Sequence, residues 1–253
     1  TRNAGAYLNI AQSGSARTDT LNNANGNLGT WATIGGGEFA VNSTNAADGL
    51  ITAPTYTLTS VALDTAANYT NAHMSVDSSQ TPAGAITPYT LTFKTAGAYG
   101  LTLTGTNTIK AGGIMVAAAV GSNASTLTGG ILQTGTAGGD LFISQNNTGE
   151  ALTIGSVIQN NTSASSLTKN GAGTLILSGQ NTYTGVTNVN AGTLKFGNAN
   201  ALVSSGVLMT GGTLDLGGVS PAIAGLRTND NVQVGTVTNS AASGTNTRTV
   251  TGG

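Results

Sequence analysis

The side chains that could carry acid–base or nucleophilic chemistry are scarce in this sequence. Its 253 residues include nine Asp and Glu, one His and no Cys. A Ser-His-Asp triad would have to use His73, with Asp77 nearby, but no Gly-x-Ser-x-Gly nucleophile elbow occurs. A lone histidine in a loop is far more often a surface residue than a catalytic base. We therefore interpret His73 as a surface residue and predict no nucleophilic catalysis.

Paired carboxylates would indicate glycoside hydrolysis, because that reaction needs two acids held about 5–10 Å apart. The acids are scattered along the chain, at Asp19, Glu38, Asp48, Asp64, Asp77, Asp140, Glu150, Asp215 and Asp230. Asp215 and Asp230, which are 230 − 215 = 15 residues apart, match the spacing of the repeat poorly. We interpret the acids as isolated and solvated, so the sequence argues against a hydrolase.

Metal, nucleotide and nucleic-acid sites also lack their usual motifs. Gly138-Gly139-Asp140 resembles part of a calcium-binding nonapeptide, but the tandem pattern is missing, which leaves bound Ca²⁺ undecided. The absence of Cys removes thiolate chemistry and Cys-type zinc sites, and no P-loop or dinucleotide fingerprint occurs. Basic residues stand singly at a net charge of −1, which gives no footprint for nucleic acid. We predict no catalytic, cofactor-binding or metal-binding residue, and hence no enzyme.

The elements that position these side chains are predicted to be β-strands. Charged residues make up only 7% of the chain, against about 25% in soluble domains. Thr, Val, Ile and Leu alternate between clusters of Gly and Asn, which favours strands and turns, and sustained helical patterning is absent. The longest apolar stretch, residues 112–120, falls short of the roughly 18–20 residues that span a bilayer. The sequence therefore predicts an all-β protein with no membrane span in this segment.

Short alternating apolar pairs recur from about Tyr89 onward. Residues i and i+2 of a strand share a face, so each pair offers two side chains to one core. The pairs include Leu91/Phe93, Leu101/Leu103, Ile114/Val116, Leu141/Ile143, Leu152/Ile154, Leu175/Leu177, Leu194/Phe196, Leu214/Leu216 and Val232/Val234.

A nearly fixed period separates the most regular of these strands. Gly-Thr-Leu segments begin at Gly173, Gly192 and Gly212, at intervals of 192 − 173 = 19 and 212 − 192 = 20. One strand per period predicts a solenoid whose coils bury their apolar faces by stacking on one another. Coils of roughly 20 residues can supply three short strands and three bends, which suits a parallel β-helix. An antiparallel sandwich is the competing interpretation.

Residues 1–88 are less regular. Strands are expected at Tyr7–Ile10, Trp31–Ile34, Glu38–Val41, Tyr56–Leu58 and Val61–Leu63. We predict one β-solenoid over residues 1–253, with irregular N-terminal coils and loop excursions in 1–88 and regular coils in 89–253.

Residues 167–196, LTKNGAGTLILSGQNTYTGVTNVNAGTLKF, closely resemble the autotransporter-associated β-strand repeat. The matching segments are Leu-Thr-Lys at 167–169, Gly-x-Gly-Thr-Leu at 171–175, Leu-Ser-Gly at 177–179, Asn-Thr-Tyr-Thr-Gly at 181–185 and Asn-Ala-Gly-Thr-Leu at 190–194. The resemblance implies a right-handed parallel β-helix in the passenger region of a large, exported bacterial protein at the cell surface. It also implies a repeat that assists export and stalk folding.

The repeat supplies the candidate structural residues of the chain. They are Leu167, Gly173, Leu175, Leu177, Asn181, Tyr183, Gly185, Asn190, Gly192, Leu194 and Phe196. Stacked coils place equivalent residues about 4.8 Å apart, so amides can hydrogen-bond from coil to coil. Asn181, Asn188 and Asn190 are expected members of such a ladder.

The favoured function is a non-catalytic structural or adhesive extracellular protein: a surface stalk, a matrix component or a filament-forming solenoid segment. Both ends look uncapped, so we expect end-to-end self-association or continuation in a longer chain. The alternative is a β-helical carbohydrate-active enzyme or a glycan-binding module, which predicts a groove with clustered acids and aromatic rings. Surface glycans are therefore candidate partners, and nucleic acid is not.

Overall fold

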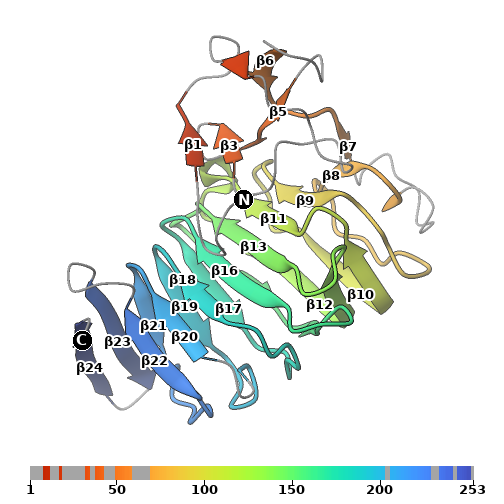
Figure 1. Cartoon of the computed structure of the whole chain (residues 1–253). Helices are drawn as coiled ribbons and strands as arrows, with labels where there is room; N and C mark the ends of the chain where they lie inside the picture. The colour runs from red at the N-terminus through yellow and green to blue at the C-terminus, as the bar shows by residue number, and fades with distance from the viewer. Residues whose placement is uncertain are drawn as a thin grey trace.

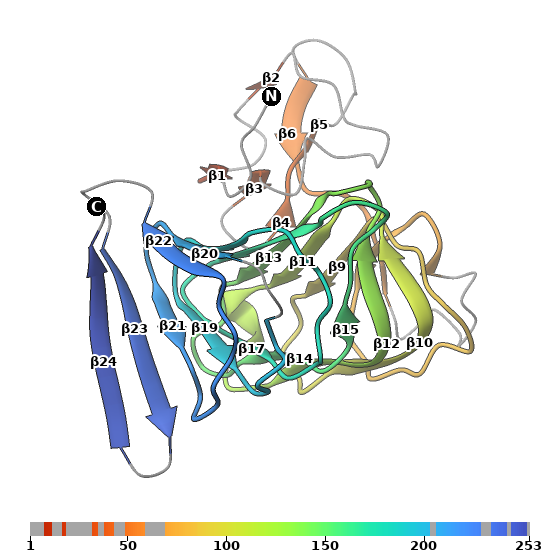
Figure 2. The same cartoon turned by 60° about the horizontal axis from the view of Figure 1, so that its bottom comes forward.

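The computed structural model describes residues 8–11, 17–18, 32–34, 38–42, 49–58, 69–202, 206–228, 234–241 and 244–251. Most of the described strands belong to two nine-stranded sheets that face each other (Figures 1 and 2). From β9 to β23 the chain alternates between the two sheets, so each coil gives at least one strand to each. Among the described residues, no helix is long and apolar enough to span a membrane.

Sheet I is parallel throughout. In spatial order it contains β22 (Gly225–Thr228), β20 (Gly206–Met209), β18 (Thr187–Val189), β16 (Ser166–Asn170), β13 (Asp140–Gln145), β11 (Gly113–Val116), β9 (Thr90–Phe93), β8 (His73–Ser75) and β7 (Tyr56–Leu58).

Sheet II is parallel except at its last pair. It runs through β10 (Gly100–Ile109), β12 (Ser125–Thr134), β14 (Leu152–Ile154), β17 (Thr174–Leu177), β19 (Thr193–Phe196), β21 (Thr213–Asp215), β23 (Val234–Ala241) and β24 (Gly244–Thr251), with β15 (Val157–Ile158) also paired to β12. Only β23 and β24 of this sheet pair antiparallel. The predicted parallel β-solenoid is confirmed, and the antiparallel sandwich is wrong.

The predicted period holds in part of the solenoid. Register neighbours differ in residue number by 187 − 167 = 20 between β16 and β18, and by 194 − 175 = 19 between β17 and β19. They differ by 142 − 113 = 29 between β11 and β13, and by 166 − 140 = 26 between β13 and β16. The earlier coils are longer because they carry larger bends, such as the one that contains the short 3-10 helix η2 (Ala118–Val120).

The coils have a third side, as three strands and three bends per coil would require. The pairing of β10 with β12 shifts register between Leu103 and Thr106, after which both strands continue along this side. The pairing of β12 with β15 extends it to the next coil. Thr182 N donates to Ile158 O at 2.8 Å, so the third side continues into residues 167–196.

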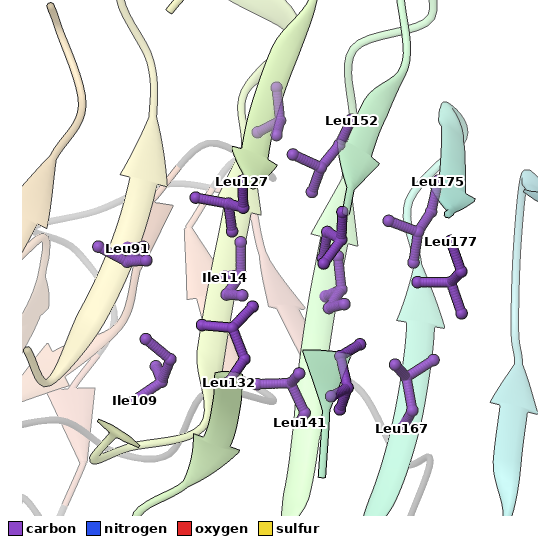
Figure 3. Close-up of a cluster of buried hydrophobic side chains, with 14 of the residues drawn as sticks. Leu91, Ile109, Ile114, Leu127, Leu132, Leu141, Leu152, Leu167, Leu175 and Leu177 are labelled. Carbon is purple, nitrogen blue, oxygen red and sulfur yellow. The ribbon is translucent and has the colours of Figure 1, made fainter. Parts of the chain in front are cut away.

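A single hydrophobic core fills the space inside the coils (Figure 3). One of its columns runs along sheet II through register neighbours Leu101, Leu127, Ile154, Leu177 and Phe196. Each of these side chains is at most 1% exposed. Because strand residues alternate between faces, their neighbours Thr126, Thr153 and Ile176 lie in register on the outer face.

The N-terminal strands do not extend the two long sheets. β1 (Leu8–Ile10), β3 (Ala32–Ile34) and β4 (Glu38–Phe39) form one three-stranded sheet, and β2 (Arg17–Thr18), β6 (Gly49–Thr52) and β5 (Val41–Asn42) form another. They lie over the outer face of sheet I, near β11 and β13 (Figures 1 and 2). Met115 and Phe142 point to that covered face and are fully buried.

The expected N-terminal strands are found in part. Those at Tyr7–Ile10, Trp31–Ile34 and Tyr56–Leu58 correspond to β1, β3 and β7, whereas Glu38–Val41 is divided between β4 and β5. The strand expected at Val61–Leu63 lies outside the described residues. A single solenoid over residues 1–253 stays a prediction.

Candidate functional site

His73, the only histidine, lies in β8 and is 9% exposed, so its interpretation as a surface loop residue is wrong. Its Nδ1 lies 3.0 Å from Thr90 Oγ1 on the neighbouring strand. The rings of Tyr89 and Tyr56 lie 5.4 and 6.3 Å from the imidazole, centroid to centroid. Close by, Lys94 pairs with Glu38 at 3.2 Å and lies 4.0 Å above the Tyr56 ring. The Lys94–Glu38 pair connects β4 of the N-terminal strands to the end of β9 in sheet I.

A polar groove lies on the outer face of sheet II. It has a volume of about 410 Å³ and is lined by residues 148–151, by Thr174 and Ile176 on β17, by Thr193 and Lys195 on β19, and by Asp215 on β21. The strand alternation explains the lining, because Leu175, Leu177, Leu194, Phe196 and Leu214 point inward. No aromatic ring is among the lining residues.

Two acids that are far apart in the sequence, Glu150 and Asp215, line this groove. Glu150 lies in the bend between β13 and β14 and is exposed, whereas Asp215 ends β21. The interpretation of the acids as isolated and solvated is wrong for Asp215 and for Glu38, because each is paired with a lysine. Asp230, the partner weighed in the sequence, lies outside the described residues.

Asp215 is held as a carboxylate. Its Oδ1 accepts from Gly217 N and Ser240 N, both at 2.9 Å, and its Oδ2 accepts from the Ser240 hydroxyl. Lys195 Nζ lies 3.6 Å from Oδ2. Burial would raise the pKa of Asp215, but the hydrogen bonds from Ser240 and Gly217 and the charge of Lys195 outweigh it and lower the pKa below 3.8. Such a group is a poor proton donor near neutral pH.

Threonines dominate the remainder of the outer face of sheet II. Thr174, Thr193, Thr213 and Thr236 are register neighbours on four successive strands. Thr102 and Thr128 lie side by side farther along, with their hydroxyls 3.5 Å apart. A second polar groove of about 350 Å³ lies there, lined by Ser79, Gln80, Thr81, Gly100, Thr102 and Thr126. This face is suited to hydrogen bonding with a polar surface.

The apolar residues of the repeat lie in the core. Leu167, Leu175, Leu177, Tyr183, Leu194 and Phe196 are all 0% exposed. The Tyr183 hydroxyl lies 2.8 Å from Thr187 Oγ1 inside the coil. Burial raises the pKa of Tyr183, so its hydroxyl stays protonated and can act as a donor.

The repeat glycines allow neighbouring coils to approach closely. A Cβ on Gly173 would lie 1.9 Å from Asn147 O of the preceding coil. Gly192 has φ +64, and a Cβ there would lie 2.4 Å from Gly171 O and Gly173 O. A Cβ on Gly185 would lie 2.3 Å from Ser165 O. Only glycine fits at these bends without displacing the backbone.

Asparagine side chains link coils, mostly by bonding to partners other than asparagine. Asn181 Oδ1 accepts from Ile158 N at 2.8 Å, and its Nδ2 donates to Ala201 O at 2.7 Å. Asn107 makes the same kind of bridge: its Oδ1 accepts from Ile86 N at 2.9 Å, and its Nδ2 donates to Ile131 O at 3.0 Å.

The other two expected asparagines bond to threonine hydroxyls. Asn188 Nδ2 donates to Thr168 Oγ1 at 3.2 Å, and Asn190 Oδ1 accepts from Thr210 Oγ1 at 2.7 Å. All three asparagines therefore connect neighbouring coils.

Lys169, which the sequence reasoning missed, is the least expected residue of the repeat. It is 0% exposed and lies inside the core. The alternation did contain the signal, because Leu167 points inward and residue 169 must share its face.

Comparisons with known proteins agree with the fold. Residues 167–196 match the family described as the passenger-associated-transport-repeat. A stretch of 97 residues, 38% of this chain, is 45% identical to the "Adhesin BmaC autotransporter" of Brucella suis biovar 1 (strain 1330). The match covers 3% of that protein, so the chain spans a small fraction of its relative's length. No solved structure matches. The resemblance to an autotransporter-associated repeat is confirmed.

Proposed function

We propose that this chain, which carries a passenger-associated-transport-repeat, is a non-catalytic stalk segment of a larger adhesive protein. The repeat and the likeness to an autotransporter adhesin indicate an exported protein at the cell surface. The observation that carries the stalk proposal is the one core cluster that extends from Tyr69 to Leu214. A stack of coils with a shared core forms a stiff rod, which suits a spacer between the cell and an attachment site.

Attachment of beads coated with the intact chain tests the adhesive part of this proposal. Beads carrying the folded chain should bind to glass, to a glycan-coated surface or to immobilised matrix proteins. Beads carrying Leu175→Asp should not, because a charge in the core unfolds the coil. Equal binding by the two bead types would show non-specific attachment, and absence of binding to all three surfaces would leave a stalk without an adhesive face. Either result contradicts the adhesive proposal.

A glycan-binding module is the second candidate, and the groove on sheet II favours it. The threonine hydroxyls, the exposed Glu150 and the Lys195–Asp215 pair offer both donors and acceptors to sugar hydroxyls. A glycan array probed with the chain should show hits that Thr174→Arg removes, because the new side chain fills the groove. Thr153→Arg is the matched control, since Thr153 lies on the same face but does not line the groove. Hits that survive Thr174→Arg would place binding elsewhere.

A carbohydrate-active enzyme at the same groove would need a protonated acid to donate to the leaving group. Asp215 does not suit this role, because its hydrogen bonds and Lys195 favour the ionised form. Any glycan that binds should therefore be recovered intact after incubation, as judged by mass spectrometry. Release of shorter sugars, abolished by Glu150→Gln, would establish hydrolysis instead.

End-to-end association of the solenoid is a further part of the proposal. Among the described strands, sheet I ends at β22, whose one partner in that set is β20, and a parallel strand of another copy could add to that edge. Contacts of this head-to-tail kind generate filaments when they do not close. Sedimentation and electron microscopy of the purified chain should show linear oligomers that grow with concentration. A monomer at every concentration contradicts this part.

A further inference from the structure

One inward position of the core column in sheet I is filled by a lysine. The strand register places Lys169 beside Ile143 on β13 and beside Val189 on β18. The column continues with Ile114 on one side and Met209 on the other, so all the nearby members are apolar. Lysine is almost never fully buried unless its charge finds partners. The partners of Lys169 therefore determine what it does.

Three main-chain carbonyls surround the amine of Lys169. Nζ donates to Asn170 O at 2.9 Å, to Gly171 O at 2.7 Å and to Ala191 O at 2.9 Å. A lysine ammonium carries three donor hydrogens, whereas the neutral amine carries two. The three acceptors therefore match the charged form. The ion pairs in the described part of the chain involve other lysines, so Lys169 is held by dipoles alone.

The three carbonyls come from two successive coils. Asn170 is the last residue of β16, and Gly171 begins the bend between β16 and β17. Ala191 belongs to the corresponding bend between β18 and β19, and its residue number is higher than that of Gly171 by 191 − 171 = 20. Lys169 thus connects the bend of its own coil to the bend of the next one. The backbone reinforces the same junction, since Asn190 N donates to Lys169 O at 2.9 Å.

In the preceding coil, a neutral side chain hydrogen-bonds to the main-chain groups of the bend. Gln145 at the end of β13 is fully buried. Its Nε2 donates to Glu150 O at 3.0 Å, and its Oε1 accepts from Asn147 N at 3.2 Å. Both partners lie in the bend that follows Gln145 itself. Gln145 therefore closes one bend, whereas Lys169 joins two.

We propose that the buried amine of Lys169 locks the first coil of the repeat onto the second by bonding to main-chain carbonyls of both, so that residues 167–196 fold as one unit. The lock would explain why a repeat of this length extends over two coils. It does not depend on the adhesive function proposed above.

The lock has a defined pH dependence. Burial lowers the pKa of Lys169 from 10.5 to about 7, while the carbonyl oxygens favour its charged form. The unfolded chain therefore binds more protons than the folded chain between about pH 7 and pH 10.5. Stability should rise with pH across that window, by up to about tenfold in the folding equilibrium constant per pH unit, and be level below it.

Other ionisable side chains on the surrounding strands do not account for such a profile. Asp140 on β13 accepts from Thr168 Oγ1 on the outer face of sheet I. Lys195 on β19 lines the outer groove, where it pairs with Asp215. Tyr183 faces the core, but burial raises its pKa, so it stays neutral throughout the window. Burial is the only cause of the lowered pKa of Lys169.

Urea unfolding of the intact chain at pH 6.5 to 10 tests the lock. In the unsubstituted chain the midpoint should rise from about pH 7 upward, as the linkage relation requires. Lys169→Met keeps most of the side-chain volume without the amine, so it should unfold earlier than the unsubstituted chain at pH 10, and its urea midpoint should not rise with pH. Gln145→Met, the matched control, should also unfold at lower urea concentration, but its urea midpoint should still rise with pH. A Lys169→Met variant that matches the unsubstituted stability and profile would show that the lysine only fills space.

Two further measurements separate an amine lock from a general loss of packing. Hydrogen exchange in residues 187–196 should speed up at least about tenfold in Lys169→Met relative to residues 90–93, because only the former belong to the locked unit. Unchanged relative exchange contradicts the two-coil unit. In Lys169→Ala at pH 10, n-butylamine should raise the urea midpoint, whereas n-butane-saturated buffer should not. Equal effects of the two additives contradict the requirement for an amine.

Discussion

Two stretches of the same solenoid build their coils differently. Between positions 166 and 215 the register neighbours differ by 19 or 20 in residue number, and the bends between the two sheets are short. Between positions 100 and 166 they differ by 25 to 29, and the bends contain η2 and residues 146–151. The core column of sheet II crosses both stretches without interruption. Stacking is therefore set by the alternating strands, and coil length is set by the bends.

The chemistry of the bends differs in the same way. The short bends depend on glycines that touch the neighbouring backbone, such as Gly173, and on the buried ammonium of Lys169. The longer ones use amide side chains: Gln145 bonds within one bend, whereas Asn147 bonds within that bend and also to Asn123 O of the preceding coil. The short bends should thus be less tolerant of substitution.

Loss of a core side chain should be equally damaging in both stretches. Phe196→Ala in the short coils should lower the free energy of unfolding by about 3–5 kcal/mol, and Leu101→Ala at the other end of the same column by about 2–5 kcal/mol. Urea unfolding followed by circular dichroism measures both. Each variant should retain one cooperative transition, because the column is continuous. Two separate transitions would mean that the stretches fold independently.

Gly173→Ala should be far more damaging than Gly155→Ala. A Cβ at residue 173 would collide with Asn147 O, whereas at residue 155 its nearest neighbour would be Ser178 Oγ at 3.4 Å. We expect a loss near the upper end of about 1–3 kcal/mol for the first variant, as for other overpacked sites. The second should stay within about 0.5 kcal/mol of the unsubstituted chain. Similar thermal unfolding curves for the two would contradict the close approach of the coils.

The asparagine bridges should contribute alike in both stretches. Asn181→Ala leaves Ile158 N and Ala201 O without their partner, and Asn107→Ala does the same for Ile86 N and Ile131 O. Each variant should lose about 1–3 kcal/mol, the usual effect of unsatisfied buried groups. Gln180→Ala is the control, because Gln180 is exposed beside Asn181. A much smaller loss at Asn107 would mean that the longer coils rely less on this bridge.

The smallest effect is expected from acid at the end of the short coils. Because the pKa of Asp215 is lowered in the folded chain, the unfolded chain binds more protons as pH falls toward 3.8. The stabilising contacts of Asp215 with Ser240, Gly217 and Lys195 are present above that pH and lost below it. We expect a loss of about 1 kcal/mol or less between pH 6 and pH 3, as for a partly screened ion pair. The loss should be absent in Asp215→Asn, as measured by urea unfolding at the two pH values.

Much of the solenoid could be predicted from local patterns. The Leu175/Leu177 and Leu194/Phe196 pairs are in fact inward pairs of adjacent coils, and the interval between them, 194 − 175 = 19, is one coil. The positions of β1, β3 and β7 were also visible as short apolar segments. The sheets that β1 and β3 join could not be predicted, because strand pairing depends on distant partners. The burial of His73 could not be predicted either, because its neighbours Tyr56, Tyr89 and Thr90 are 16 or 17 residues away in the sequence.

The sequence by itself determined the all-β class, the parallel stacking and the inward residues of the repeat, because strand alternation and a fixed period are local properties of the chain. The side chains that line one groove, and the groups that surround a buried side chain, depend on the tertiary structure. Glu150 and Asp215 line one groove, and carbonyls from two coils surround Lys169. The physical reason is that stacking brings residues one or more coils apart within contact distance, and the number of intervening residues depends on bends that no repeat pattern specifies.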